Sequence, residues 1–402
     1  MKLNKKELQN ILVEMSKLKR VSDKDMHGCV QVKASNDKST CAFSFVGVYT
    51  NLSCAVKLLD GLSERSFKKY IPLTEFRLVL GTKGGKSDSV EIKFSKTKAK
   101  VFVYDEEDKE QASFKISLVK KEDVSFKFGK AEISWGDSLE QDIFSLSRST
   151  KFVKTVMPDN LLASNISGMF FEPRDGNVVC VNQTQAKLGH IDVGDMDPFF
   201  VVPDGAKSLT RISGAATTRG METCHLFTSK PLDKEKSQYV RFLFSNVDVD
   251  VFWDLKTTLS SCTFAPYKVI LLEKNPSIKT PSVEFARAIE LYKSIDANAI
   301  LFKLSVEKKC LVMTSCETEV LISAEVPMEF EESPGLQKVF AINPSLLSEA
   351  LGSKKEMGEE ISITFDKDNR YAPIRIDLEK QGLFSLTSPF RLEKQILDSP
   401  LN

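Results

Sequence analysis

The sequence predicts an α+β protein built from three copies of one domain, each with two helices packed on antiparallel sheets. A short motif recurs three times, with an apolar run, a nearby proline and a helix-like stretch that ends at glycine. The motif prolines, 131 and 141 residues apart, are Pro72, Pro203 and Pro344. An amphipathic stretch precedes each motif, at residues 8–18, 143–153 and 283–292. Repeats of this size indicate an architecture of similar domains.

The first amphipathic stretch has apolar residues at spacings of three and four, which form one stripe on a helix. The stripe consists of Leu8, Ile11, Leu12, Met15 and Leu18. Basic residues occupy the other face and the ends, namely Lys5, Lys6, Lys17, Lys19 and Arg20. In the last third of the chain, Phe285, Ile289 and Tyr292 form the equivalent stripe.

Between the helices, apolar and polar residues alternate with a period of two. The clearest stretches are 89–95, 99–104, 239–244 and 360–365. This pattern predicts half-buried antiparallel strands, with helices on one face of each sheet.

The chain is too long for a single core, and it divides well into three domains. Turn-forming residues near 129–131 and 274–276 predict boundaries that give domains 1–129, 130–274 and 275–402, the last with a tail at 393–402. No long linker separates them, so we expect rigid junctions.

Composition indicates a protein of a reducing compartment. The 8 cysteines are scattered without a C-x-x-C pair, and they are interpreted as thiols, some of them in the core. No run of 18 apolar residues and no apolar signal core occur. We therefore expect a cytoplasmic protein with no membrane partner.

Charge is unevenly distributed. Six helix windows (5–20, 74–86, 143–154, 204–219, 282–294 and 344–356) together hold +10, although the whole chain has a net charge of +1. Basic helices on an acidic body favour a protein that faces phosphates. The alternative is that Lys and Arg are there simply as good helix formers.

No motif argues for an enzyme or a cofactor. Residues 81–87 resemble a phosphate-binding loop but have one residue too few, and a helix rather than a strand precedes them. The histidines His27, His190 and His225 have no partner at metal-ligand spacing. Asp248 and Asp250 share a strand face, which is interpreted as solvated.

Several stretches resemble the bacterial DNA polymerase sliding clamp, the beta subunit of the replicative polymerase. In the second domain they are residues 165–172, which read NISGMFFE, and Phe200–Pro203. In the third they are Phe285–Ala288 (FARA), 342–347 (INPSLL) and 388–392 (SPFRL). The first domain matches by pattern only.

The resemblance implies a head-to-tail homodimeric ring of six domains, with twelve helices around a central hole and sheets outside. Basic residues on those helices would attract duplex DNA without reading its sequence. The candidates for this lining are Lys17, Lys19, Arg20, Arg148, Lys151, Lys154, Lys207 and Arg211. For each of them, a solvated surface residue is the alternative.

The resemblance also implies an apolar pocket between domains two and three that captures peptides of polymerases and clamp loaders. Its residues would be Ile166, Gln183, Lys187, Leu188, Val269, Ile270, Phe285, Asn343, Leu346, Tyr371, Pro389, Phe390, Arg391 and Leu392. About a third of these could be plain core, with Ile166 and Leu188 the foremost.

Two departures indicate a divergent clamp. The family's Thr-Asp-Gly-His-Arg-Leu-Ala is replaced by Gln183–Gly189, so that the Gly, His and Arg of the pocket wall are missing. The chain also continues past Leu392, and we hypothesise that Ile396 or Leu397 folds back into the pocket. The divergence and the lysine content would suit a virus-encoded clamp.

The sequence therefore predicts a non-enzymatic processivity factor for a DNA polymerase. A structural or interaction scaffold that keeps the fold but binds no DNA is the alternative. An enzyme would need clustered titratable groups in one pocket, and none can be assembled from the sequence.

Overall fold

The structure is a computed structural model of the 402-residue chain. It describes residues 1–18, 28–34, 39–47, 49–60, 67–81, 87–124, 133–157, 168–229, 238–246, 249–260, 277–316, 320–330, 339–353, 357–366, 369, 371–378 and 382–389. The chain forms two compact units, residues 1–147 with 194–261 and residues 148–193 with 262–402. The second domain expected from the sequence contributes to both units, and the two predicted domain boundaries stay a prediction.

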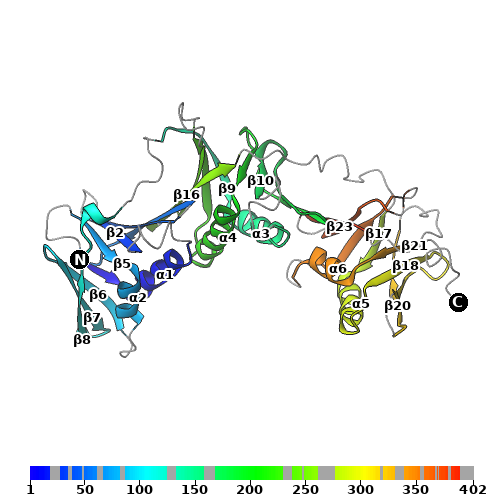
Figure 1. The fold of residues 1–402 in the computed structure, drawn as a ribbon, viewed down its shortest axis with the longest axis horizontal. Coiled ribbons are helices and arrows are strands. Elements are labelled where there is room, and N and C mark those ends of the chain that lie inside the picture. The colour runs from blue at the N-terminus through cyan, green and yellow to red at the C-terminus, as the bar shows by residue number, and fades with distance from the viewer. Residues whose placement is uncertain are drawn as a thin grey trace. The chain divides into compact units, whose positions relative to one another are not determined.

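Helices lie against sheets in both units (Figure 1). The described α-helices are α1 (Lys5–Ser16), α2 (Leu73–Gly81), α3 (Ile143–Lys154), α4 (Pro203–Thr218), α5 (Ser282–Ser294) and α6 (Pro344–Leu351). Two short 3-10 helices span Lys121–Asp123 and Pro173–Asp175.

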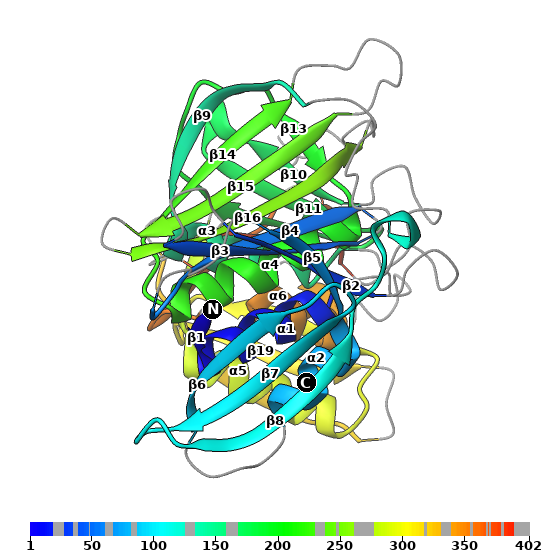
Figure 2. The ribbon, with the colours of Figure 1, turned by 90° about the vertical axis from the view of Figure 1, so that its left-hand side faces the viewer.

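The first unit has two antiparallel sheets, which are seen face-on in Figure 2. One has the order β1-β6-β7-β8, with strands Lys2–Asn4, Ser87–Phe94, Lys98–Asp105 and Glu110–Ser117. The other has the order β9-β14-β15-β16-β4-β3-β2-β5, and β13 also pairs with β16. Its strands are β2 (Cys29–Ala34), β3 (Thr40–Val46), β4 (Thr50–Lys57), β5 (Lys68–Pro72), β9 (Trp135–Asp142), β13 (Phe199–Val201), β14 (Thr223–Ser229), β15 (Tyr239–Asn246) and β16 (Val249–Ser260).

The second unit also has two antiparallel sheets. One has the order β17-β22-β23-β24-β12-β11-β10 and the other β20-β19-β18-β21. The strands are β10 (Met169–Glu172), β11 (Asn177–Val181), β12 (Gln185–His190), β17 (Ser277–Pro281), β18 (Ala299–Ser305), β19 (Cys310–Cys316), β20 (Ser323–Pro327), β21 (Val339–Ile342), β22 (Glu360–Thr364), β23 (Ile374–Leu378) and β24 (Leu383–Thr387). The predicted α+β class, with helices on antiparallel sheets, is confirmed.

Helix α1 begins where the sequence requires a cap. The side chain of Asn4 accepts a hydrogen bond from the backbone N–H of Glu7 at 3.0 Å, which satisfies one of the open donors of the first turn. The predicted apolar stripes are confirmed, because Leu8, Ile11, Leu12, Met15 and Leu18 of the first and Phe285, Ile289 and Tyr292 of α5 are all buried. Burial of such stripes, rather than helix propensity, supplies most of the stability of short helices.

The repeats are joined edge to edge by strand pairs with the same register. In the first unit β16 pairs with β4, and Thr257 lies opposite Thr50. In the second unit β24 pairs with β12, and Thr387 lies opposite Gln185.

These positions correspond in the repeat. Thr50 and Gln185 each close the turn before their strand, through the bonds Gly47 N–H to Thr50 C=O and Asn182 N–H to Gln185 C=O. The strand pairs that lead from the start of α3 to β16 match those that lead from the start of α5 to β24. When residues are matched across these pairs, Thr257 and Thr387 occupy the same position in their repeats. One pairing geometry is therefore used twice.

Candidate functional site

The middle of α4 meets the C-terminal end of α1 in the first unit. Arg211 of α4 donates a hydrogen bond from Nη1 to the carbonyl oxygen of Lys17, the C-cap of α1, at 2.9 Å. The ammonium of Lys17 lies 2.7 Å from the carboxylate of Glu14. Arg211 and Lys17 are exposed, and Lys207 on the same helix is half-buried. Three of the predicted basic residues therefore belong to two neighbouring helices.

A second arginine, which the sequence did not single out, also links these helices. Arg219 follows α4; its guanidinium lies 3.6 Å from the Glu7 carboxylate and 4.8 Å from the ring centre of Trp253. It also donates to the Glu7 carbonyl oxygen at 3.4 Å. A cation over a buried indole is held firmly, so Arg219 fixes the two helices together.

Helix α3 has three further basic residues in the second unit, two of them in its last turn. Arg148 and Lys151 are exposed and Lys154 is half-buried. Cations in the last turn are favourable because they face the negative end of the helix dipole. The predicted residues Lys19 and Arg20 lie outside the described residues.

A cavity lies in the second unit where the β11–β12 turn approaches β23 and β24. It is lined by Val181, Asn182, Gln183, Thr184, Gln185, Ala186, Pro373, Leu386, Thr387 and Ser388. Gln183 is the one residue among them that the sequence assigned to the partner pocket, and its side chain is exposed. The junction strands themselves therefore form the walls of the cavity.

Gln185 fixes this wall to α6. Its amide donates to the carbonyl oxygen of Leu346 at 2.6 Å and to the hydroxyl of Thr387 at 3.0 Å. Its side-chain oxygen is buried and has no hydrogen-bond partner in the described structure. A buried acceptor of this kind favours a ligand that brings an N–H or O–H donor.

Lys187, two residues further along β12, is fully buried. Its ammonium donates to the hydroxyl of Thr155 at 2.8 Å and to the carbonyl oxygen of Glu349 in α6 at 2.5 Å, and it lies 4.3 Å from the ring centre of Phe152. It therefore ties the end of α3 to the end of α6 and does not line the cavity.

The remaining predicted pocket residues are spread around these strands. Leu188 points to the face opposite Lys187 and packs with Val179 in a small apolar cluster. This position agrees with the alternative interpretation of Leu188 as a core residue. Asn343 caps α6 by accepting from the N–H groups of Ser345 and Leu346. Leu346 meets Gln185 through its carbonyl group.

Phe285, Tyr371 and Pro389 do not line the cavity. Phe285 is fully buried, with its ring 6.3 Å from that of Phe302, whereas Tyr371 is exposed and Pro389 is half-buried. The predicted residues Ile166, Val269, Ile270, Phe390, Arg391 and Leu392, and the tail residues Ile396 and Leu397, lie outside the described residues.

Sequence reasoning missed Gln185, Thr387 and Arg219. A signal existed for Gln185, because it shares one face of its strand with Lys187, which the sequence had singled out. The partner of that strand, and therefore Thr387, depends on pairing across about 200 residues of chain, which periodicity does not encode.

Within the described ranges, no three His, Cys, Asp or Glu residues come together in a way that could hold a metal ion. No helix in the described part of the chain has the length and apolar character needed to cross a bilayer.

Comparison with solved structures identifies the fold. The chain is similar to a DNA polymerase III subunit beta sliding clamp from Pseudomonas aeruginosa bound to griselimycin, at 14% identity and a TM-score of 0.77, covering 98% of this chain and 99% of that one. It is also similar to the DNA polymerase III beta subunit of Thermotoga maritima (16%, TM-score 0.73, 98% and 99%) and to a sliding clamp from Bartonella birtlesii (10%, TM-score 0.75, 98% and 99%). No family model and no curated protein matches the sequence.

Proposed function

We propose that this chain, which has the fold of the bacterial sliding clamps, is itself a DNA sliding clamp: a non-catalytic, cytoplasmic processivity factor for a DNA polymerase. Two copies form a closed ring around duplex DNA. Basic side chains of the helices face the phosphates without sequence readout. The cavity beside Gln185 receives peptides of the polymerase and of the clamp loader.

The observation that best supports a ring is the repeated junction. The same strand pair, in the same register, joins successive repeats twice: Thr257 opposite Thr50, and Thr387 opposite Gln185. A head-to-tail contact that is repeated with a constant geometry closes into a ring when its rotation allows. A third junction of this kind would join two copies.

The strands for that third junction are present. In the described sheets β8 is the outer strand of β1-β6-β7-β8, and β20 is the outer strand of β20-β19-β18-β21. Within the repeat, β8 occupies the same position as β16 and β24, and β20 occupies the same position as β4 and β12. A pair of matching hydrogen bonds supports the correspondence of β20 with β4: Leu59 N–H bonds to Lys2 C=O, and Glu329 N–H bonds to Lys279 C=O.

The repeat also sets the register between copies. It places Ile116 of β8 opposite Val320 of the second copy, and Ser113 opposite Ser323. Val320 and Leu321 have exposed fractions of 49% and 80%, and Leu321 is the most exposed of the large hydrophobic residues described. Pairing would cover both residues and would remove two open sheet edges, which are a liability in an isolated chain.

A cysteine pair tests the ring and the DNA function separately. The double variant Ser113→Cys/Ser323→Cys is mixed with a nicked circular plasmid at low protein concentration, concentrated, oxidised and washed in high salt. We expect a cross-linked dimer that stays with the circle and is released by cutting the DNA or by reduction. The matched control is Ser113→Cys/Glu325→Cys, which is two residues out of register and should cross-link poorly.

Each outcome decides between the proposed classes. A cross-linked dimer that washes off circular DNA would favour the scaffold and contradict the clamp. Equal cross-linking of both cysteine pairs, or none in either, would contradict the proposed ring junction.

A further inference from the structure

The outer face of the sheet β1-β6-β7-β8 has a row of lysines at one end. The inner face of this sheet packs against α1 and α2 through buried residues such as Ile92, Val101 and Ile116. Side chains alternate between the faces, so the neighbours of these residues in the strands point outward. Pairing places Lys93 opposite Lys100, and Lys100 opposite Lys115.

This row is electrostatically unfavourable for the protein alone. Like charges directly opposite one another on adjacent strands destabilise a sheet. Lys93 lies 3.2 Å from the carboxylate of Glu91. No carboxylate in the described chain lies within ion-pairing distance of Lys100 or Lys115, and the exposed Lys96 and Lys98 extend the basic end.

Aromatic rings lie beside the row on the same face. The ammonium groups of Lys93 and Lys100 are 5.0 and 4.3 Å from the ring centre of Phe102, and Phe102 is 8% exposed in this arrangement. The rings of Phe102 and Tyr104 are nearly parallel, with centres 6.4 Å apart and planes at 25°. Basic residues interleaved with aromatic rings on an open sheet form the kind of surface that binds single-stranded nucleic acids.

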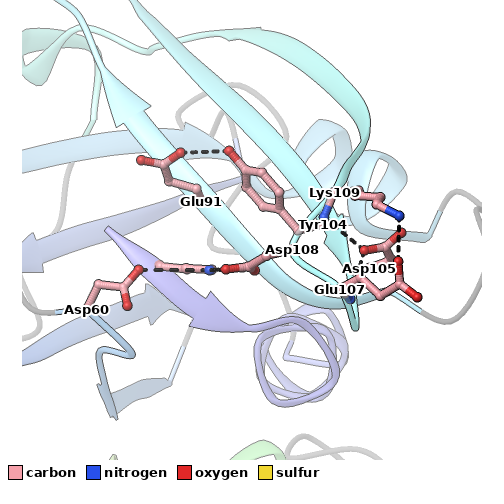
Figure 3. Close-up of polar contacts among 8 residues, drawn as sticks. Asp60, Glu91, Tyr104, Asp105, Glu107, Asp108 and Lys109 are labelled. Carbon is pink, nitrogen blue, oxygen red and sulfur yellow. Dashed lines mark hydrogen bonds and ion pairs between the residues drawn. The ribbon is translucent and has the colours of Figure 1, made fainter.

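The other end of the same strands is acidic, and part of its charge is paired internally. Figure 3 shows Tyr104 directed toward Glu91, and Asp105, Glu107 and Lys109 at the β7–β8 turn. Asp108 is paired with Lys2 at 2.7 Å. A polyanion would therefore be confined to the lysine end of the face.

The absence of apolar anchors argues against a protein partner. Protein interfaces depend on a few large apolar or aromatic side chains that fill pockets. Of the described exposed large hydrophobic residues, none lies on β6, β7 or β8. A second copy placed in the register proposed above would put Leu321, not an acid, opposite Lys115. A phosphate backbone needs no apolar anchor.

We propose that this face, formed by Lys93, Lys98, Lys100, Lys115, Phe102 and Tyr104, is a second nucleic-acid site that binds a single strand without sequence preference. The lysine ammonium groups bind the phosphates. When the ammonium groups of Lys93 and Lys100 move away from the Phe102 ring, a base stacks on that ring. The site is distinct from the basic helices, which are proposed to face duplex DNA.

The test is binding of a fluorescent oligothymidylate to the full chain over a series of salt concentrations. Lys100→Gln/Lys115→Gln should weaken binding about tenfold at low salt and should reduce the slope of log affinity against log salt by about 1.4, which is 0.7 for each lost phosphate contact. The matched control is Lys33→Gln/Lys68→Gln, an exposed, in-register lysine pair on β2 and β5, which should bind as the parent does.

Stacking is tested with a second variant and a second probe. Phe102→Leu should weaken binding of oligothymidylate at least about fivefold but leave binding of an abasic oligomer of the same length unchanged. Retention of the cross-linked ring on circular duplex should be the same in all these variants, which separates this site from the proposed clamp function.

Four outcomes would overturn the proposal. They are no binding of the parent protein to oligothymidylate, equal losses in the Lys33/Lys68 control, an equal loss of duplex affinity in Lys100→Gln/Lys115→Gln, and lysine-dependent binding to anionic phosphatidylserine vesicles in place of the oligonucleotide.

Discussion

The guanidinium of Arg211 donates a hydrogen bond to the backbone carbonyl of Lys17, a residue 194 positions earlier in the chain. Both residues were predicted to face DNA, yet their roles in the fold differ. Arg211 joins α4 to the end of α1 through its side chain, whereas Lys17 contributes to that contact only through its backbone.

Replacing these two residues should therefore affect stability differently. Arg211→Ala should lower the free energy of unfolding by about 0.5–1.5 kcal/mol, because the hydrogen bond to α1 is lost. Lys17→Ala removes the same charge but keeps the carbonyl acceptor, and it should cost at most about 0.5 kcal/mol from its pair with Glu14. Urea denaturation measures both, and equal losses would contradict a structural role for Arg211.

The buried Lys187 should matter more for packing than for charge. Lys187→Ala should destabilise the protein by about 2–4 kcal/mol, because it leaves a cavity between α3 and α6. Lys187→Met fills that space and should cost about 1 kcal/mol or less, since the Glu349 carbonyl still accepts from the N–H of Gly352. The exposed Gln183→Ala is the control and should be neutral. If the Met variant unfolded as easily as the Ala variant, the ammonium itself would be the stabilising group.

Tyr104 should make stability depend on pH in the alkaline range. Burial, together with the hydrogen bond to Glu91, raises the pKa of Tyr104 to about 12 from its usual value of 10. The folded state therefore holds the phenol proton more tightly than the unfolded chain. The stabilisation is complete below pH 10 and is lost as pH rises from 10 toward 12. Denaturation of the parent and Tyr104→Phe between pH 9 and 11 measures it, and a constant difference between them would refute the linkage.

The cysteine thiols should be unreactive in the native state. Burial raises the pKa of Cys29 and of Cys41 to about 12 and also raises the pKa of Cys54, Cys180 and Cys224. Few thiolates then exist at pH 8, and the sulfur atoms are inaccessible as well. Titration with Ellman's reagent should leave these five thiols unmodified until denaturant is added, and rapid modification of Cys29 without unfolding would contradict this.

The sequence predicted those parts of the fold that are local. The stripe from Leu8 to Leu18 and the alternation in residues 99–104 each follow from periods of 3.6 and 2, and α1, α5 and β7 lie where these periods place them. The choice of strand partners is not local. Neither period indicates that β16 pairs with β4, or β24 with β12.

The candidate site was less predictable for the same reason. Lys187 was assigned to the partner pocket through the resemblance to the sliding clamps, and lysine is rarely buried without a partner. Its burial depends on Thr155, which follows α3, and on Glu349 in α6, which only the folded chain brings together. The assignments of the remaining DNA-facing and pocket residues stay predictions.

The identical register of the two internal junctions has a consequence for how assembly could fail. A contact that is repeated head to tail has no built-in end, and the number of units is set only by the angle that each junction adds. In the proposed ring, two of the three junction types lie within one chain and are protected by its continuity. The proposed junction between copies has no such protection. A slip of two residues there would keep every apolar side chain on its proper face but alter the angle, and the product would be an open helical filament.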